Sequence, residues 1–263
     1  MLEYQFFRLA LIGVAIISIA ASLIGTYIIT RRMVAIAGGV THACFGGLGL
    51  GYFLGVSPIF MAGVFAIVSS LGVEWMSSRM RIRQDSATAV IWAIGMAIGV
   101  LFVFLTPGYV PELNTFLFGN ILTVTPADLW AFGIYTAVLV VLFATRFRLI
   151  VTCAFDSDFA RVARLPVRTV SLVMTVMVAL CIVLTIRLVG IMLLMSMLSL
   201  PMMTAETFVG RLKPMMALSA AISLAASVGG LVLATVIDVP CSALIVLLLA
   251  AAFVIARIVR SFL

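Results

Sequence analysis

Apolar runs of about 20 residues fill most of this chain, and that length is what an α-helix needs to cross the hydrocarbon core of a bilayer. A membrane β-barrel would show short alternating segments instead. The runs therefore predict an all-α, polytopic membrane helix bundle of about nine transmembrane helices. The expected spans are about 9–30, 33–54, 57–78, 86–105, 127–145, 169–187, 189–209, 214–236 and 240–259.

Composition leaves no room for a sizeable soluble domain. Hydrophobic residues make up 65% of the chain and charged residues 10%, with a mean hydropathy of +1.36. Soluble domains have about 25% charged residues. Residues 1–263 are therefore expected to form a single transmembrane domain of the cell membrane, surrounded by lipid. Arg187, Gly190 and Pro201 interrupt the stretch 169–209, so eight spans are the alternative count.

The basic residues predict the orientation of the chain. With the N-terminus outside and nine spans, all of the 16 basic residues except Arg8 and Arg187 fall on the cytoplasmic side. Cytoplasmic loops of membrane proteins carry such an excess of Lys and Arg. This distribution indicates an N-out, C-in chain, and it explains the net charge of +7 without a nucleic-acid partner.

The motifs of common enzyme classes do not occur. There is no GxxxxGK[ST] sequence, and the single lysine, Lys213, does not follow a glycine-rich loop, so no ATP site is expected on this chain. One histidine cannot form an HExxH motif. Cys44, Cys153, Cys181 and Cys241 have no CxxC spacing. We therefore expect a chain that is not an enzyme and binds no cofactor.

His42, the only histidine, lies inside the span 33–54, where an ionisable side chain marks a functional site by default. It could act as a substrate ligand or as a proton relay. The alternative is a histidine hydrogen-bonded between packed helices. Gly38, Gly39, Gly46 and Gly47 flank it, and such glycines either let a neighbouring helix approach or contact a cargo.

Two carboxylates outside this segment also matter. Asp238 precedes the last span on its outer side, where it is either a ligand or a cap of a helix N-terminus. Glu74 lies close to Arg79 and is expected at the membrane interface. In the run 190–203, methionines indicate packing more than soft-metal binding, and Pro201 is expected to kink the helix.

The loops contain two predicted short helices. In the cytoplasmic loop 146–168, Asp156 or Ser157 can cap a helix over about 156–166 that Pro166 ends. Phe159, Val162 and Leu165 lie among charges there, so this helix would bind the membrane surface or a partner. On the outer side, Leu113–Leu122 could form a short amphipathic helix.

Five segments in order resemble the permease subunits of metal-uptake ABC transporters, the family that handles zinc, manganese and chelated iron. The segments are RRMVAIAGGVTHACFGGLGLG, LFGNIL, FDSDFARVARLPV, VGIMLLMSMLSLPMMTA and IDVPCSALIVL. This chain departs from the family pattern at four positions. Gly38 replaces an acidic residue four positions before the histidine, and Arg164 replaces a glycine after the cytoplasmic helix. Glu206 replaces an arginine, and Cys241 replaces a glycine.

The resemblance implies a permease subunit of an ATP-driven importer, which moves a divalent zinc, manganese or iron ion from an extracytoplasmic binding protein to the cytosol. ATP would bind a separate ATP-binding subunit, and a second permease copy or a sister permease would complete the path. The implied residues fall into three sets. They are His42, Asp238 and Cys241 for the metal path; Asp156, Asp158, Phe159, Val162 and Leu165 for ATPase docking; and Gly38, Gly46, Gly47, Gly190 and Pro201 for helix packing or gating.

Two other classes of function are alternatives to the importer. A proton-coupled secondary carrier would use His42 as its proton site, but the inverted repeats expected of such carriers are not evident. An intramembrane enzyme would need His42 and Asp238 at one depth, whereas the expected spans place His42 near the middle of the bilayer and Asp238 at its outer edge. The importer is therefore preferred, with its metal and its homodimeric or heterodimeric state left open.

Overall fold

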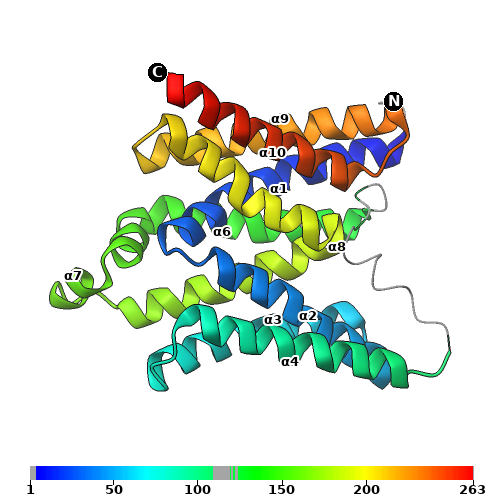
Figure 1. Cartoon of the computed structure of the whole chain (residues 1–263), viewed down its shortest axis with the longest axis horizontal. Helices are drawn as coiled ribbons and strands as arrows, with labels where there is room; N and C mark the ends of the chain where they lie inside the picture. Colours follow the sequence, from blue (N-terminus) through cyan, green and yellow to red (C-terminus); the bar gives the residue numbers. More distant parts are fainter. Residues whose placement is uncertain (1–3, 109–118, 120, 122–123, 263) are drawn as a thin grey trace. The chain divides into compact units, whose positions relative to one another are not determined.

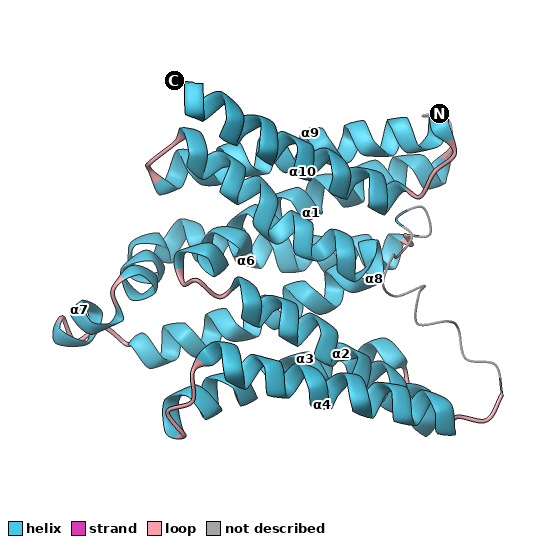
Figure 2. Ribbon diagram, in the orientation of Figure 1, coloured by secondary structure: helices cyan, strands magenta, loops and turns pink. Residues whose placement is uncertain are grey.

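The computed structural model describes residues 4–108, 119, 121 and 124–262. Across these residues the regular structure is helical, which confirms the predicted all-α class (Figure 2). Within this described part of the chain, eight helices are long and apolar enough to cross a membrane. They are α1 (Gln5–Thr30), α2 (Val34–Leu54), α3 (Pro58–Arg79), α4 (Gln84–Leu105), α6 (Pro126–Phe155), α8 (Val167–Phe208), α9 (Leu212–Ile237) and α10 (Cys241–Phe262).

Helix α8 contains two of the nine predicted spans. Its 42 residues would measure about 63 Å at 1.5 Å per residue, twice the thickness of a hydrocarbon core. The backbone leaves the helical conformation at Gly190 (φ 79°, ψ 173°), in a region that only glycine adopts easily. This break separates residues 167–189 from 191–208, close to the predicted spans 169–187 and 189–209. The eight helices thus provide eight or nine spanning segments, depending on how α8 is counted.

Pro201 is buried and lies inside helical backbone of α8. The non-helical φ and ψ inside α8 belong to Gly190. A proline inside a helix removes one N–H donor and tends to kink the helix, so the kink expected at Pro201 stays a prediction.

The loop 146–168, which is predicted to be cytoplasmic, is more helical than expected. Helix α6 continues to Phe155 through a distortion at Arg146 (φ −118°, ψ 18°). The short helix expected at about 156–166 is present as α7 (Ser157–Val162), but only six residues long. The predicted outer helix Leu113–Leu122 falls on residues of which only 119 and 121 are described.

The chain divides into two compact units. The first comprises Met1–Arg31, Asn114–Phe147 and Leu184–Leu263. Within it, α1 packs on α9 through serine hydroxyls: Ser22 Oγ donates to the Met216 carbonyl (2.5 Å), and Ser223 Oγ donates to Ser18 Oγ (3.2 Å). Small residues and hydroxyls that bond across helices are the usual means of packing in lipid.

The second unit comprises Arg32–Leu113 and Arg148–Val183 and holds α2, α3 and α4 side by side (Figure 1). A Cβ atom added to Gly47 would lie 2.6 Å from Ala62 Cα, and one added to Gly51 would lie 2.6 Å from Pro58 Cα. Along these contacts the residue numbers rise in α2 and fall in α3, so these two helices are antiparallel. Glycines of α2 and α4 meet in rising order on both helices, so α2 and α4 are parallel.

Candidate metal path and docking helix

His42 lies in the first half of α2 and is half-buried. Its ring stacks on the indole of Trp92 from α4, with centroids 4.6 Å apart and planes 10° from parallel. Stacking covers a face of the imidazole, whereas both ring nitrogens lie in the ring plane and remain suited to a proton or a metal. No single-sequence pattern links Trp92 to His42, because the contact depends on how α2 and α4 are rotated.

Gly38 lies one helical turn before His42, and residues four apart share a helix face. A carboxylate at this position would stand beside the imidazole. Glycine supplies none, so α2 provides a nitrogen ligand without the adjacent acidic oxygen that the resembling family has there.

Gly46 and Gly47 lie where α2 meets its neighbours. A Cβ on Gly46 would lie 2.5 Å from the Phe65 ring of α3 and 2.9 Å from the Gly95 carbonyl of α4. Gly47 faces the backbone of Met61 and Ala62 in α3. Side chains at these positions would push the helices apart, so both glycines have contacts suited to helix packing.

Gly95 and Gly99 of α4 were missed by the sequence reasoning, although they form a GxxxG motif. A Cβ on Gly95 would lie 2.5 Å from Ala43 Cα, and one on Gly99 would lie 2.5 Å from the Phe45 carbonyl oxygen. Both contacts are with the backbone of α2 on either side of Cys44. The motif therefore positions the segment of α2 that follows His42.

Asp238 ends α9, and the expectation of a cap at a helix N-terminus is wrong. It is exposed, in the left-handed conformation (φ 59°, ψ 51°), and α10 starts only at Cys241. Pro240 precedes that start, and the Val239 N–H donates to the Ala234 carbonyl (3.3 Å), closing the end of α9. A carboxylate at a helix C-terminus is unfavourable with respect to the helix dipole, so Asp238 does not serve helix stability.

The predicted metal-path residues belong to different units: His42 to the second, Asp238 and half-buried Cys241 to the first. Among the residues that the structure describes, no three His, Cys, Asp or Glu side chains cluster to hold a metal ion. The described residues therefore provide single candidate ligands and not a cluster of three.

Helix α7 has a well-defined beginning. The Asp156 carboxylate accepts from the Asp158 N–H (3.1 Å) and the Phe159 N–H (2.8 Å), which caps the helix. Asp158 pairs with Arg161 at 3.1 Å on the exposed surface. Phe159 and Val162 are 60% and 84% exposed, whereas Ala160 is fully buried. The helix thus presents two large apolar side chains on its outer side, while Leu165 beyond it is half-buried.

Arg164 ends α7 in the left-handed conformation (φ 58°). The Arg164 N–H donates to the Arg161 carbonyl (3.0 Å), and the Leu165 N–H donates to the Ala160 carbonyl (2.9 Å). These two bonds form a Schellman motif, whose left-handed position usually holds glycine. The resembling family has glycine at this position, and the backbone conformation supplies the physical reason.

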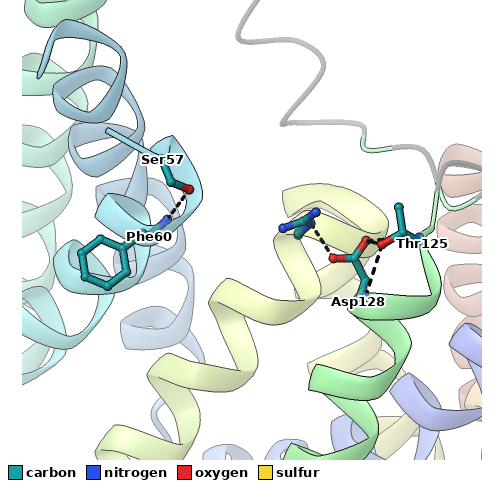
Figure 3. A network of polar contacts seen from close by, with 5 residues as sticks. Ser57, Phe60, Thr125 and Asp128 are labelled. Carbon is teal, nitrogen blue, oxygen red and sulfur yellow. Dashed lines mark hydrogen bonds and ion pairs between the residues drawn. The ribbon is translucent and has the colours of Figure 1, made fainter. Parts of the chain in front are cut away.

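An ion pair accounts for one of the two basic residues that the predicted topology left outside. Arg187 Nε lies 2.7 Å from Asp128 Oδ1. Asp128 also accepts from the Thr125 hydroxyl (2.6 Å) at the start of α6 (Figure 3). Gly119 packs against the backbone at Val189 and Gly190 in the same unit. No pattern in the sequence predicts this arrangement around the break in α8.

Glu74, which was expected at the membrane interface close to Arg79, bonds to hydroxyl groups of α8. Its carboxylate accepts from the Ser171 hydroxyl at Oε1 (2.9 Å) and from the Thr175 hydroxyl at Oε2 (3.1 Å), both on α8. The ion pairs of the described residues involve Asp85, Asp128 and Asp158, and Glu74 is in none of them. A partly buried carboxylate therefore lies between α3 and α8, and its partners among the described residues are two hydroxyl donors.

These features define a class of protein: a multi-pass helical membrane protein with a capped surface helix and an intramembrane histidine. The model of the ABC 3 transport family matches residues 3–260. The chain belongs to this family.

Relatives and a solved structure agree with this assignment. A "probable metal transport system membrane protein" of Chlamydia pneumoniae is 35% identical, covering 88% of this chain and 81% of the relative. The "manganese transport system membrane protein MntC" of Halalkalibacterium halodurans is 27% identical over 97% of this chain and 88% of the relative. The structure of PsaBC from Streptococcus pneumoniae in complex with Fab is similar with a TM-score of 0.85 and 28% identity. The similarity covers 97% of this chain and 91% of the matching chain in that structure.

Proposed function

We propose that this chain is the permease subunit of an ATP-driven importer for a divalent metal ion, with manganese as the first candidate. The observation that supports this most strongly is the match of residues 3–260 to one transport family. The similarity to a manganese transport membrane protein over 97% of the chain supports the choice of metal. Residues 1–263 act as one transmembrane permease domain with α7 as its cytoplasmic extension.

The metal path uses His42 as a ligand from α2. One histidine per chain is a partial site, and a second permease copy or a sister permease supplies the other half. Cys241 and Asp238 are further candidate ligands from the α9–α10 turn. Weak coordination suits a path, because tight binding by four ligands would trap the ion.

ATP hydrolysis takes place on a separate ATP-binding subunit, which docks on α7. Phe159 and Val162 are the exposed apolar side chains of that helix, and Asp156 fixes its first turn. An extracytoplasmic binding protein delivers the ion from outside. Closure of the ATP-binding subunits then changes the access of the path from outward to inward.

The test is uptake of radioactive or fluorescent-probe-detected Mn²⁺ in a strain that lacks the chromosomal transporter and expresses this chain with its ATP-binding subunit. We expect uptake to stop when the ATP-binding subunit is inactivated and to survive a protonophore while ATP is maintained. His42→Ala should lower uptake at least about tenfold at equal expression, since a lost ligand weakens transient coordination. Uptake that follows the proton gradient would instead support the secondary carrier.

A further inference from the structure

We propose that Glu74, Ser70, Ser171 and Thr175 form a binding site for a divalent cation between α3 and α8, on the predicted cytoplasmic side of His42. This inference rests on the proposed function for the identity of the cation, which is the transported metal. It assigns a second binding position to the path, made of oxygen ligands.

Three residues of α3 face α8 along one stripe. Glu74 bonds to Ser171 and Thr175 of α8, and a Cβ on Gly63 would lie 3.6 Å from Val183 of α8. Residues 63, 70 and 74 are separated by seven and four positions, which places them on one helix face. Ser70 therefore lies on the α8-facing stripe, one turn before Glu74.

Ser70 has an unexplained hydroxyl. Its side chain is 5% exposed, and its Oγ atom has no hydrogen-bond partner among the described residues. A buried hydroxyl without a partner is costly. Several serines and threonines in these helices avoid that cost by donating to the carbonyl four residues earlier, as Thr41 and Thr88 do. Ser70 does not, so its oxygen remains available to a ligand beside the Glu74 carboxylate.

The chemistry of the four groups fits a hard divalent cation. Carboxylate and hydroxyl oxygens are the ligands that Mn²⁺ and Mg²⁺ prefer. Each hydroxyl oxygen has lone pairs that it can turn toward a cation by rotating its hydrogen away. One carboxylate neutralises half of the charge of a divalent ion, which gives the weak coordination that onward movement requires.

The position of the cluster fits an inner stage of the path. The contacts of Gly47 with Ala62 and of Gly51 with Pro58 set the antiparallel register of α2 and α3. Extending that register places Glu74 level with the first turn of α2, about 10 Å along the helix axis from His42 at 1.5 Å per residue. That end carries Arg31, Arg32 and Arg79, the side that the charge distribution predicts to be cytoplasmic.

The experiment uses the purified permease with its ATP-binding subunits in lipid nanodiscs, without nucleotide. The electron paramagnetic resonance signal of free Mn²⁺ measures how much Mn²⁺ the complex binds. All variants carry His42→Ala, so that binding at that residue does not contribute. We expect Glu74→Gln to weaken the remaining binding at least about tenfold, as loss of a metal partner commonly does. Ser70→Ala should weaken it measurably, and Glu206→Gln, which removes an exposed carboxylate of α8, should leave it unchanged.

Ser70→Ala separates a cation site from a structural link. If Glu74 only ties α3 to α8, removing an unpaired buried hydroxyl should leave Mn²⁺ binding unaltered. Equal affinity with and without Ser70→Ala, or with and without Glu74→Gln, overturns the proposal, as does the absence of Mn²⁺ binding in the His42→Ala background. Cellular uptake of Mn²⁺ tests the proposed function separately. If the chain supports uptake but Mn²⁺ binding does not depend on Glu74 and Ser70, only the second site is refuted.

Discussion

Two residues adopt an unusual backbone conformation at helix ends: Arg164, which departs from the pattern of the resembling family, and Asp238, which matches it. Arg164 and Asp238 both adopt the left-handed conformation at the end of a helix, with φ of 58° and 59°. A residue with a Cβ in this region costs roughly 1–2 kcal/mol relative to its ordinary conformation. At Arg164 the hydrogen bonds of a Schellman motif explain why the conformation persists. At Asp238 the carboxylate adds an unfavourable interaction with the helix dipole, which is consistent with the proposed role in the metal path.

Arg164→Gly is expected to stabilise the end of α7 by about 1 kcal/mol, because glycine adopts the left-handed conformation without steric strain. The measurement is hydrogen exchange of the Leu165 amide, which donates to the Ala160 carbonyl. Exchange should slow about fivefold, the factor that about 1 kcal/mol corresponds to. Ala163→Gly is the control, because Ala163 has a φ of −73° and glycine there should speed exchange. Equal effects of both substitutions would contradict the explanation.

Between elements, the contact of α2 with α4 determines the surroundings of His42. Gly95 and Gly99 allow the backbone of α4 to touch α2 beside Ala43 and Phe45, and Trp92 on the same helix covers His42. In lipid, apolar side chains gain little by leaving the bilayer for a helix interface, so close backbone approach provides much of the association. The glycines of α4 are therefore as important for the position of His42 as those of α2.

Gly99→Ile should destabilise the permease by roughly 2 kcal/mol, the typical effect of overpacking. The added side chain would collide with the Phe45 carbonyl, which belongs to the backbone and cannot rotate away. Thermal unfolding of the purified complex measures the loss. Gly133→Ile in α6 is the matched control, because nothing lies within 4 Å of a Cβ there; its effect should stay within about 0.5 kcal/mol. A Gly99→Ile variant as stable as the control would refute close α2–α4 packing.

At the scale of the whole molecule, α7 is the surface through which this chain is proposed to respond to ATP. It is capped by Asp156, held by the buried Ala160, and followed directly by α8. The first turns of α8 carry Ser171 and Thr175, which bond to Glu74 of α3. A displacement of α7 would thus reach α3 through covalent continuity and two hydrogen bonds.

Replacing Phe159 and Val162 together by Asp should abolish co-purification with the ATP-binding subunit. Two charges would enter an apolar contact, and desolvating unpaired charges is strongly unfavourable. The amount of permease in the membrane fraction should not change, because both side chains are exposed. Thr169→Asp adds a charge at an exposed position early in α8 and should leave co-purification intact. Retention of the ATP-binding subunit by the double variant would rule out docking on this face.

Much of this architecture is determined by the sequence alone. Length and hydropathy locate the spans, because a helix must satisfy all of its backbone hydrogen bonds internally in lipid. Local rules located α7 and its Asp156 cap, and five ordered segments indicated the family. The prediction failed in detail where local signals were weak, as in the continuation of α6 to Phe155 and the true position of Asp238 at the end of α9.

Contacts between helices were decided only by the tertiary structure. Lipid-facing and protein-facing sides of these helices are almost equally apolar, so no hydrophobic stripe reveals their rotation. The stacking of Trp92 on His42, the pairing of Arg187 with Asp128 and the hydroxyl partners of Glu74 all depend on that rotation and on helix register. The sequence determined which segments enter the membrane and to which family they belong. The packing of backbone against backbone determined which side chains meet there.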